Sequence, residues 1–578
     1  MRCFLVLLLC LGLWTIETAD GIEADGSLNP KLQALAQEFF GWRAIQQPAT
    51  GDDIPRVERP DGWVPDWSPA ALTRYRAAYR VFLARLGELD NSGWSKADQV
   101  DARLLRAAIL RVRWELDILR SPHRNPLFYI DQTLGSVFEL LIISSPITPQ
   151  RAENIVLRLE AFPELTQAAY TNLDQAVRPF SRAAITMLAG IDERLKKMRV
   201  ALQLHFPEEL RERMQRATRG AVSALQAYSR WLRSADPIMT NEFSLGTDAY
   251  SFFLANVALI PHTPGELLAQ GRLAWERAVT FDTLEKNRNA SLESPAIFDD
   301  LQAQIDTSRR MEGRIRQFLE AHNLMTVPSW LKRYLNRPLP DHLAPLAFMG
   351  VTDDLTSETR LDEHAISYVP DPSPDLPYFY LATAQDPRPL IVHEGVPGHY
   401  FQLAQSWKNP DPVRRRYIDS GANEGIGFYV EEMLLQAGLF DDSPKTREII
   451  YSFMRLRALR VEVDIRLATG DFTIEQAGDY LARTVPMDLE TATKEAVFFA
   501  FNPGQAISYQ IGALQIIRFL SDARLDLKDD FSLRHFHDSL MQNGNVPIAL
   551  QRWEYLDRAD EINRLDEMVK KAISITGK

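Results

Sequence analysis

Apolar residues recur at helical spacing along most of this 578-residue chain. The pattern is clearest after Ser95-Lys96-Ala97-Asp98, a segment that resembles a capping box. Apolar residues there alternate at spacings of four and three: Leu105, Ile109, Val112, Leu116 and Leu119. One stripe of such a helix must be buried. Because comparable patterns cover many other segments, the sequence predicts a mostly α-helical protein. These segments are 30–46, 208–236, 265–322, 411–438, 445–468, 505–525 and 547–574.

Proline-rich stretches interrupt the helices at residues 47–70, 336–346 and 370–377. The segments on either side of the last stretch are rich in aromatic and β-branched residues, which favour short strands. These segments are 364–370 and 378–383. We therefore expect an N-terminal helical lobe over residues 20–345 and a C-terminal lobe over residues 346–578, with a small β-element just before a histidine motif.

The N-terminus reads Met1, Arg2 and then CFLVLLLCLGLW, an apolar run too short to cross a bilayer of ~30 Å as a helix. This shape is typical of a secretory signal peptide, which we assign to residues 1–19. A lipoprotein signal ending at Cys10 fits less well, because a leucine rather than a small residue precedes that cysteine. The sequence predicts a periplasmic or secreted protein without a stable membrane anchor.

Both cysteines of the chain, Cys3 and Cys10, lie within this N-terminal segment. The exported chain would have neither a disulfide nor a thiolate, so a large packed core must stabilise it and any metal site must use His, Asp or Glu. The net charge of −12 disfavours binding to phosphate backbones, which requires clustered Lys and Arg. We therefore expect no nucleic-acid partner.

The segment HEGVPGHYFQ, residues 393–402, carries two histidines and a glutamate within seven positions. In the zinc-binding pattern H-E-x-x-H the histidines are four residues apart on one helix face. His393 and His399 are six apart, which would separate them by about 240° around an ideal helix. However, Pro397 must bend or stop the helix, and Gly398 permits unusual backbone angles. A break and restart at this point could return His399 to a shared metal.

The segment NEGIGFYVEE supplies a third ligand, Glu424, 25 residues after His399. A helix, a turn and an antiparallel helix would return a carboxylate at that distance to the histidines. Two histidines and a carboxylate leave one position open for water, as in catalytic zinc sites. Zinc would lower the pKa of that water toward ~7, and Glu394 would accept its proton. We expect Glu431 and Glu432 to orient ligands or to face solvent.

Five segments carry a wider pattern: HEGVPGHYFQ, NEGIGFYVEE, RALRVEVDIR, NPGQAISYQIG and FHDSLMQNGNVP. In this order they resemble the bacterial domain of unknown function 885 family, whose signature is H-E-x-x-P-G-H-H followed by E-G-W-A-x-Y-x-E. The resemblance extends upstream to residues 246–271. It implies a two-lobed, mostly α gluzincin-like metallopeptidase fold, similar to thimet oligopeptidase and carboxypeptidase Taq. The implied site has zinc on His393, His399 and Glu424, with Glu394 as general base.

Three further residues are candidates for the site. The resemblance implies that Tyr509 donates to the developing oxyanion; the other interpretation is a buried tyrosine bonded to a backbone carbonyl. His537 either assists the reaction or caps its helix. Arg460 either binds a substrate carboxylate, since its guanidinium can hold both oxygens, or belongs to an internal ion-pair network.

The sequence departs from the family pattern at a few positions. Tyr400 replaces the second histidine of the H-H pair, and Phe428-Tyr429 follows Gly427 where the family has a Trp-containing variant. Ala468 stands where the family has a histidine, and Arg466 where it has a glycine. If that histidine contacts substrate in relatives, the departure affects specificity or activity. The expected metal ligands are intact.

These observations favour an exported zinc-dependent metallopeptidase, an oligopeptidase, dipeptidase or carboxypeptidase that acts on short peptides in a cleft between helical lobes. Two alternatives stay open. One is a noncatalytic periplasmic binding protein for peptides or metal, which Tyr400 and Ala468 favour. The other is an oxygenase with ferrous iron on the same three ligands.

Overall fold

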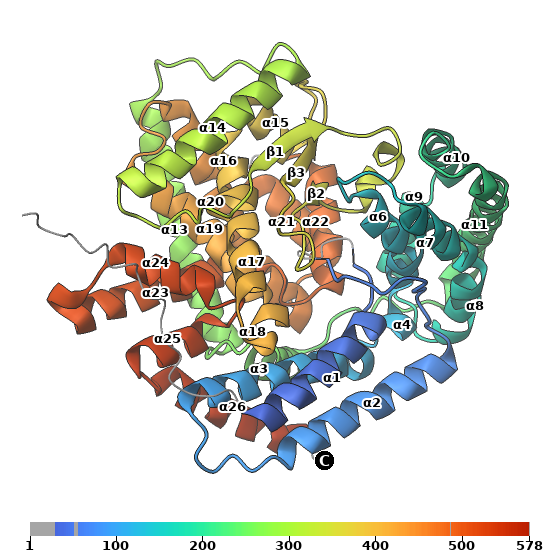
Figure 1. Ribbon diagram of the computed structural model, residues 1–578, viewed down its shortest axis with the longest axis horizontal. Helices are drawn as coiled ribbons and strands as arrows, with labels where there is room; N and C mark the ends of the chain where they lie inside the picture. The colour runs from blue at the N-terminus through green and yellow to red at the C-terminus, as the bar shows by residue number, and fades with distance from the viewer. Residues whose placement is uncertain (1–28, 51–55, 486, 577–578) are drawn as a thin grey trace, which may run out of the picture.

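The computed structural model of the protein describes residues 29–50, 56–485 and 487–576 (Figure 1). The predicted signal peptide, residues 1–19, lies outside the described residues. Helices dominate, which confirms the predicted mostly α fold.

The first part of the chain forms helices α1 (Pro30–Gln46), α2 (Pro69–Gly87), α3 (Lys96–Arg113), α4 (Ser121–Arg124), α5 (Pro126–Ile130), α6 (Ser136–Leu141), α7 (Pro149–Glu160), α8 (Phe162–Asn172), α9 (Arg178–Met187), α10 (Ile191–Leu202) and α11 (Glu208–Ala235). The middle part forms α12 (Thr247–Asn256), α13 (Pro264–Arg288), α14 (Leu301–Ala321), α15 (Tyr378–Gln385), α16 (Arg388–Leu390), α17 (His399–Lys408), α18 (Pro412–Arg416) and α19 (Ser420–Ala437). The last part forms α20 (Pro444–Thr469), α21 (Ile474–Thr484), α22 (Leu489–Phe501), α23 (Ile507–Leu527), α24 (Leu533–Gln542), α25 (Ile548–Leu556) and α26 (Asp560–Thr576).

Helix α3 shows how the local signals act. Ser95 and Asp98 form the predicted capping box, in which each side chain accepts a hydrogen bond from the backbone N–H of the other. Leu105, Ile109 and Val112 are fully buried along one stripe. The helix then continues as a π-helical turn, η1 (Trp114–Ile118), which buries Leu116.

The sheet is small and has the order β1-β3-β2. Strand β3 (Ala365–Val369) confirms the strand expected at 364–370, and it pairs parallel with β1 (Tyr334–Pro338) and antiparallel with β2 (Asp353–Asp354). Strand β1 overlaps a stretch expected only to interrupt helices; as an edge strand it tolerates Pro338 at its end.

The strand predicted at 378–383 is wrong, because these residues form helix α15. Its aromatic residues pack on α20: the Phe379 ring lies 5.2 Å from that of Phe453, and the Tyr378 hydroxyl lies 2.5 Å from the Ser452 hydroxyl. The aromatic residues here serve packing against another helix rather than strand pairing. The continuous pattern expected over 265–322 also divides into α13 and α14.

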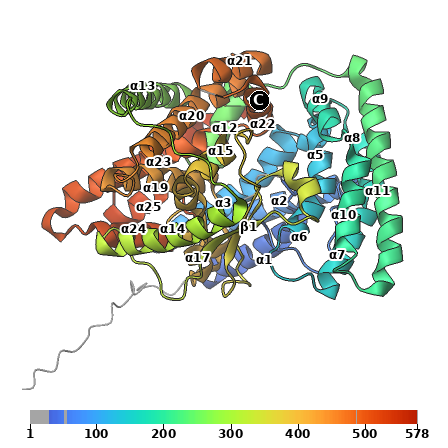
Figure 2. The same ribbon diagram turned by 90° about the horizontal axis from the view of Figure 1, so that it is seen from above.

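Figures 1 and 2 both show α7 to α11 on one side of the molecule and α23 to α25 on the other, with β1 and α17 between them. Residues from both predicted lobes share the largest hydrophobic core, for example Leu32, Leu225 and Leu550. The boundary near residue 345 therefore stays a prediction. Across the described ranges, no helix is at once long enough and apolar enough to span a bilayer.

Candidate metal centre

The predicted helix break brings the two histidines of the motif together. His393 lies in a π-helical turn, η5 (Ile391–Gly395), and the backbone becomes extended at Val396 before α17 begins at His399. The imidazole centroids of His393 and His399 are 4.7 Å apart. A Cβ at position 398 would lie 1.8 Å from the carbonyl oxygen of His393, so only glycine fits at this turn.

Helix α19 brings Glu424 to the histidines. Its Oε2 lies 3.5 Å from His393 Nε2 and 3.3 Å from His399 Nε2. One ligand atom from each of the three residues falls within 4.8 Å of the others, and all three side chains are buried. The ligands predicted from the sequence therefore form one group that could hold a metal ion.

Two close approaches set the position of α19. A Cβ on Gly427 would lie 2.9 Å from His399 Cε1 and 3.0 Å from His393 Cε1, so this glycine lets both imidazoles pack against the helix. A Cβ on Gly425 would lie 2.6 Å from the Cα of Gly512 on α23. The glycines thus allow α19 to touch the imidazoles on one face and α23 on another.

A buried carboxylate and an arginine orient His393. Glu431 Oε1 lies 2.7 Å from His393 Nδ1, and Arg457 Nη2 lies 2.9 Å from the same oxygen. This contact leaves Nε2 of His393 facing Glu424. Carboxylate partners of this kind fix the ring orientation and the tautomer of metal-binding histidines. The expectation that Glu431 orients a ligand agrees with this geometry.

The electrostatics of the group suit a cation. Burial opposes ionisation of Glu424, yet the imidazoles of His399 and His393 hold its pKa below the ordinary value. Within the described part of the chain, Oε2 of Glu424 is buried and receives no hydrogen bond. A buried carboxylate oxygen without a donor is costly unless a cation pairs with it. Two imidazoles and a carboxylate therefore fit a zinc ion that keeps one position open.

Glu394 is half-buried next to His393, and it lines a cavity together with His393 and Glu424. Burial raises its pKa, and the carboxylates of Asp353 and Glu424 add to the rise while His399 opposes it. Asp353 is held by hydrogen bonds of 2.7 Å from the hydroxyls of Tyr334 and Ser367. The sheet thus supplies Asp353 to the wall near Glu394.

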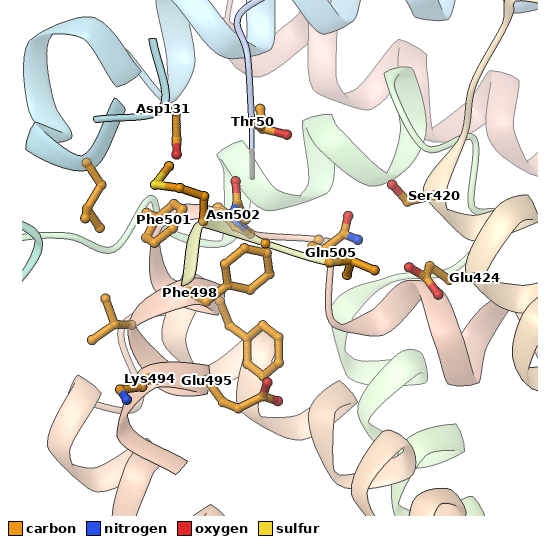
Figure 3. Close-up of a pocket in the computed structure, with 18 of the residues that line it drawn as sticks. Thr50, Asp131, Ser420, Glu424, Lys494, Glu495, Phe498, Phe501, Asn502 and Gln505 are labelled. Atoms are coloured by element: carbon orange, nitrogen blue, oxygen red, sulfur yellow. The ribbon is translucent and has the colours of Figure 1, made fainter. Parts of the chain in front are cut away.

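A cavity of about 1670 Å³ opens over these residues. Figure 3 shows residues that line it, among them Thr50, Asp131, Phe498, Asn502 and Gln505. Tyr509 also lines it, and its ring is nearly parallel to that of His393 at a centroid distance of 6.2 Å. Tyr509 lies on α23. Asp464 holds the backbone just before this helix by accepting hydrogen bonds from the N–H groups of Gly504 and Ala506.

The remaining candidates lie in different surroundings. Arg460 lines the cavity, but its guanidinium is bonded to Glu495. His537 is fully buried outside the cavity lining; its Nδ1 lies 2.7 Å from the Leu324 carbonyl oxygen and its Nε2 lies 2.8 Å from the Tyr429 hydroxyl. Both ring nitrogens are thus engaged by the protein, and neither caps the helix that carries His537.

None of the described positions that depart from the family pattern is among the residues that line the cavity; all are buried except Arg466, whose side chain is 37% exposed. Tyr400 is packed in the hydrophobic cluster around α17 and α19. Ala468 is also buried, and its carbonyl accepts hydrogen bonds from the N–H groups of Leu245 and Gly246. The ring of Phe428 packs against Arg457, whose guanidinium carbon lies 5.2 Å from the centroid of that ring. These departures therefore change packing rather than the cavity wall.

Comparisons with known proteins place the chain in a family and a fold. A solved structure of a proposed lipoprotein of unknown function from Shewanella oneidensis is 16% identical, with a TM-score of 0.69 and coverage of 92% of this chain and 100% of that one. A proposed lipoprotein from Colwellia psychrerythraea is also 16% identical, with a TM-score of 0.70 and coverage of 93% and 98%. No curated protein matches this chain. The model of the bacterial proteins of unknown function DUF885 matches residues 47–553, so the chain belongs to that family.

Proposed function

We propose that this protein is an exported zinc-dependent metallopeptidase that hydrolyses short peptides. The observation that supports it most is the convergence of His393, His399 and Glu424, of which His393 and Glu424 line a large cavity together with Glu394. This donor set is typical of catalytic zinc, and a glutamate beside the first histidine is the general base of such sites.

The chain supplies the acid, base and oxyanion groups of the proposed reaction. Zinc, when bound, contributes Lewis acidity, which acidifies water and polarises a carbonyl. Glu394 takes a proton from the attacking water and returns it to the leaving amine. The Tyr509 hydroxyl donates a hydrogen bond to the carbonyl oxygen as negative charge develops there. Glu431 keeps His393 in its ligand orientation.

The size of the cavity favours short peptides. At about 1670 Å³ it exceeds the ~300–1,000 Å³ of ordinary small-molecule pockets. Its walls come from elements far apart in the sequence, including Phe128 on α5 and Phe498 on α22. A flexible oligopeptide can enter such a space, whereas a folded protein cannot.

A peptide digest with a metal analysis tests the proposal. Protein purified without added metal should contain one zinc per chain and should cleave members of a mixed peptide library, and a chelator should stop the cleavage. Glu394→Gln should keep its zinc and lose turnover; loss of both together would contradict the base assignment. A library left intact by zinc-loaded protein would favour the noncatalytic binder, and iron as the resident metal would favour the oxygenase.

Export belongs to the same proposal. Its support is the apolar segment after Arg2 and the description of two proteins of the same fold as proposed lipoproteins. Fractionation of cells that express the full chain should recover it in the periplasm, the envelope or the medium. A lipidated Cys10 would place it in the membrane fraction, and recovery in the cytoplasm would refute export.

A further inference from the structure

We infer that Glu495 binds a positively charged nitrogen of the substrate. The inference deepens the proposed peptidase function and rests on it. It concerns a carboxylate in the cavity wall that the hydrolytic reaction itself does not use.

Glu495 lies on the face of α22 that lines the cavity. Figure 3 shows its carboxylate pointing into the open space, near the ring of Phe498 and across from Glu424. The side chain of Glu495 is 21% exposed, whereas that of its partner Arg460 is only 7% exposed. Both residues line the cavity, and the carboxylate is the more accessible of the two to a substrate.

The bond between the two residues leaves half of the carboxylate available. Nε and Nη2 of Arg460 both donate to Oε2 of Glu495, at 3.1 and 2.6 Å. Among the residues that the structure describes, no donor bonds to Oε1. Because a carboxylate can accept about four hydrogen bonds, Glu495 keeps acceptor capacity that faces the cavity.

Arg460 is a positioning residue in this arrangement. Its guanidinium carbon lies 4.9 Å from the centroid of the Tyr509 ring and 5.3 Å from that of Phe499. The guanidinium is thus fixed between two rings with its hydrogens directed at Glu495. A substrate carboxylate could reach Arg460 only by displacing Glu495, so the structure favours recognition of a cation over recognition of an anion.

The location of Glu495 relates this cation site to the proposed metal centre. Arg460 joins it to Tyr509, whose ring lies 6.2 Å from that of His393. Three contacts therefore separate the carboxylate from a metal ligand. Since an extended peptide advances ~3.4 Å per residue, the cationic nitrogen belongs within a few residues of the scissile bond. The Phe498 ring adds a surface that attracts cations.

The nitrogen has two sources with the same chemistry: the N-terminal amine of the peptide, or the side chain of Lys or Arg. Calorimetric binding distinguishes them on Glu394→Gln protein, in which the proposed base is removed. The probes are pentaalanine, N-acetyl-pentaalanine, and N-acetylated alanine pentapeptides with Lys or norleucine at each position in turn. Binding is read directly, without turnover.

We expect at least one charged probe to bind at least tenfold tighter than its neutral counterpart, and the difference to fall below threefold when Glu495→Gln is added. Glu490→Gln is the matched control: Glu490 also lines the cavity from α22, but it pairs with Lys494 at an exposed position. This control should keep the full difference. Glu495→Asp retains the charge and should keep part of it, which separates loss of the site from loss of folding.

Two results would overturn the inference: equal affinity for charged and neutral probes, or discrimination that survives Glu495→Gln. The two proposals fail separately. Charge discrimination without cleavage by the wild-type protein would refute the peptidase and retain the cation site. Cleavage without charge discrimination would refute the cation site and retain the peptidase.

Discussion

Substitution of Glu431 by Gln should weaken both metal binding and folding, for two separable reasons. The carboxylate lies 2.7 Å from His393 Nδ1 and 2.9 Å from Arg457 Nη2, and its side chain and that of Arg457 are 1% and 5% exposed. Glutamine can still accept a hydrogen bond from the imidazole, but it carries no charge. Arg457 is then a buried cation without its carboxylate, 3.5 Å from His393 Nδ1.

The magnitudes follow from these contacts. Loss of a carboxylate that supports a metal-binding histidine costs about 10- to 100-fold in metal affinity, or about 1.4 to 2.7 kcal/mol. Breaking one side of a buried ion pair costs a further ~3 kcal/mol or more of unfolding free energy. In the double variant Glu431→Gln/Arg457→Met, the unpaired cation is removed. Stability should largely return while the zinc affinity stays low.

The assay is competition for zinc against a chromophoric chelator, with denaturant unfolding of the metal-free protein as the second readout. Glu432→Gln is the control, because Glu432 is the next residue on α19 and is only half-buried. The reasoning is refuted if Glu431→Gln binds zinc within twofold of the wild type. It is also refuted if Glu432→Gln loses as much affinity.

Three further outcomes are expected. Gly427→Ala should lower zinc affinity more than tenfold, because the new carbon would lie 2.9 Å from His399 Cε1. The control is Gly41→Ala, whose new carbon has no atom within 4 Å and which should bind zinc like the wild type. The same chelator competition measures both variants. Tyr509→Phe should lower kcat ~100-fold, the loss of ~3 kcal/mol typical of an oxyanion donor, with zinc content unchanged; equal kcat would remove Tyr509 from the mechanism. Burial raises the pKa of Asp464 from 3.8 to about 7, so the folded protein holds a proton that the unfolded chain releases. This contribution to stability is complete below about pH 4 and is lost as the pH rises through about 7, a decrease of ~4 kcal/mol. Urea unfolding across that range should show a shallower pH dependence for Asp464→Asn, and an unchanged dependence would contradict the assignment.

Local signals in the sequence were enough for much of the fold. The four-three spacing after Ser95 predicted α3 and its buried stripe, since that period depends only on the geometry of one helix. The metal group could be predicted for a similar reason. Pro397 and Gly398 break the helix between His393 and His399, and a backbone break is decided by the residues at the break itself.

Signals of composition alone were less reliable. The aromatic residues from Tyr378 onward are helical because they pack on α20, a helix about 70 residues later in the chain. Their composition is the same in either conformation, so only the packing partner decides between them. His537 is a similar case, since its ring nitrogens are engaged by Tyr429 and by the Leu324 carbonyl.

The sequence by itself determined the helical class, the break at Pro397 and the three residues of the group that could hold a metal ion. The tertiary structure alone decided that Glu431 and Arg457 hold His393, and that Glu495 pairs with Arg460 in the cavity wall and is the more exposed of the two. The physical reason is that these pairings join α19, α20, α22 and η5 across large sequence separations. Their geometry depends on how closely the helices approach, as at Gly425 and Gly512, and no local pattern of residues encodes that distance.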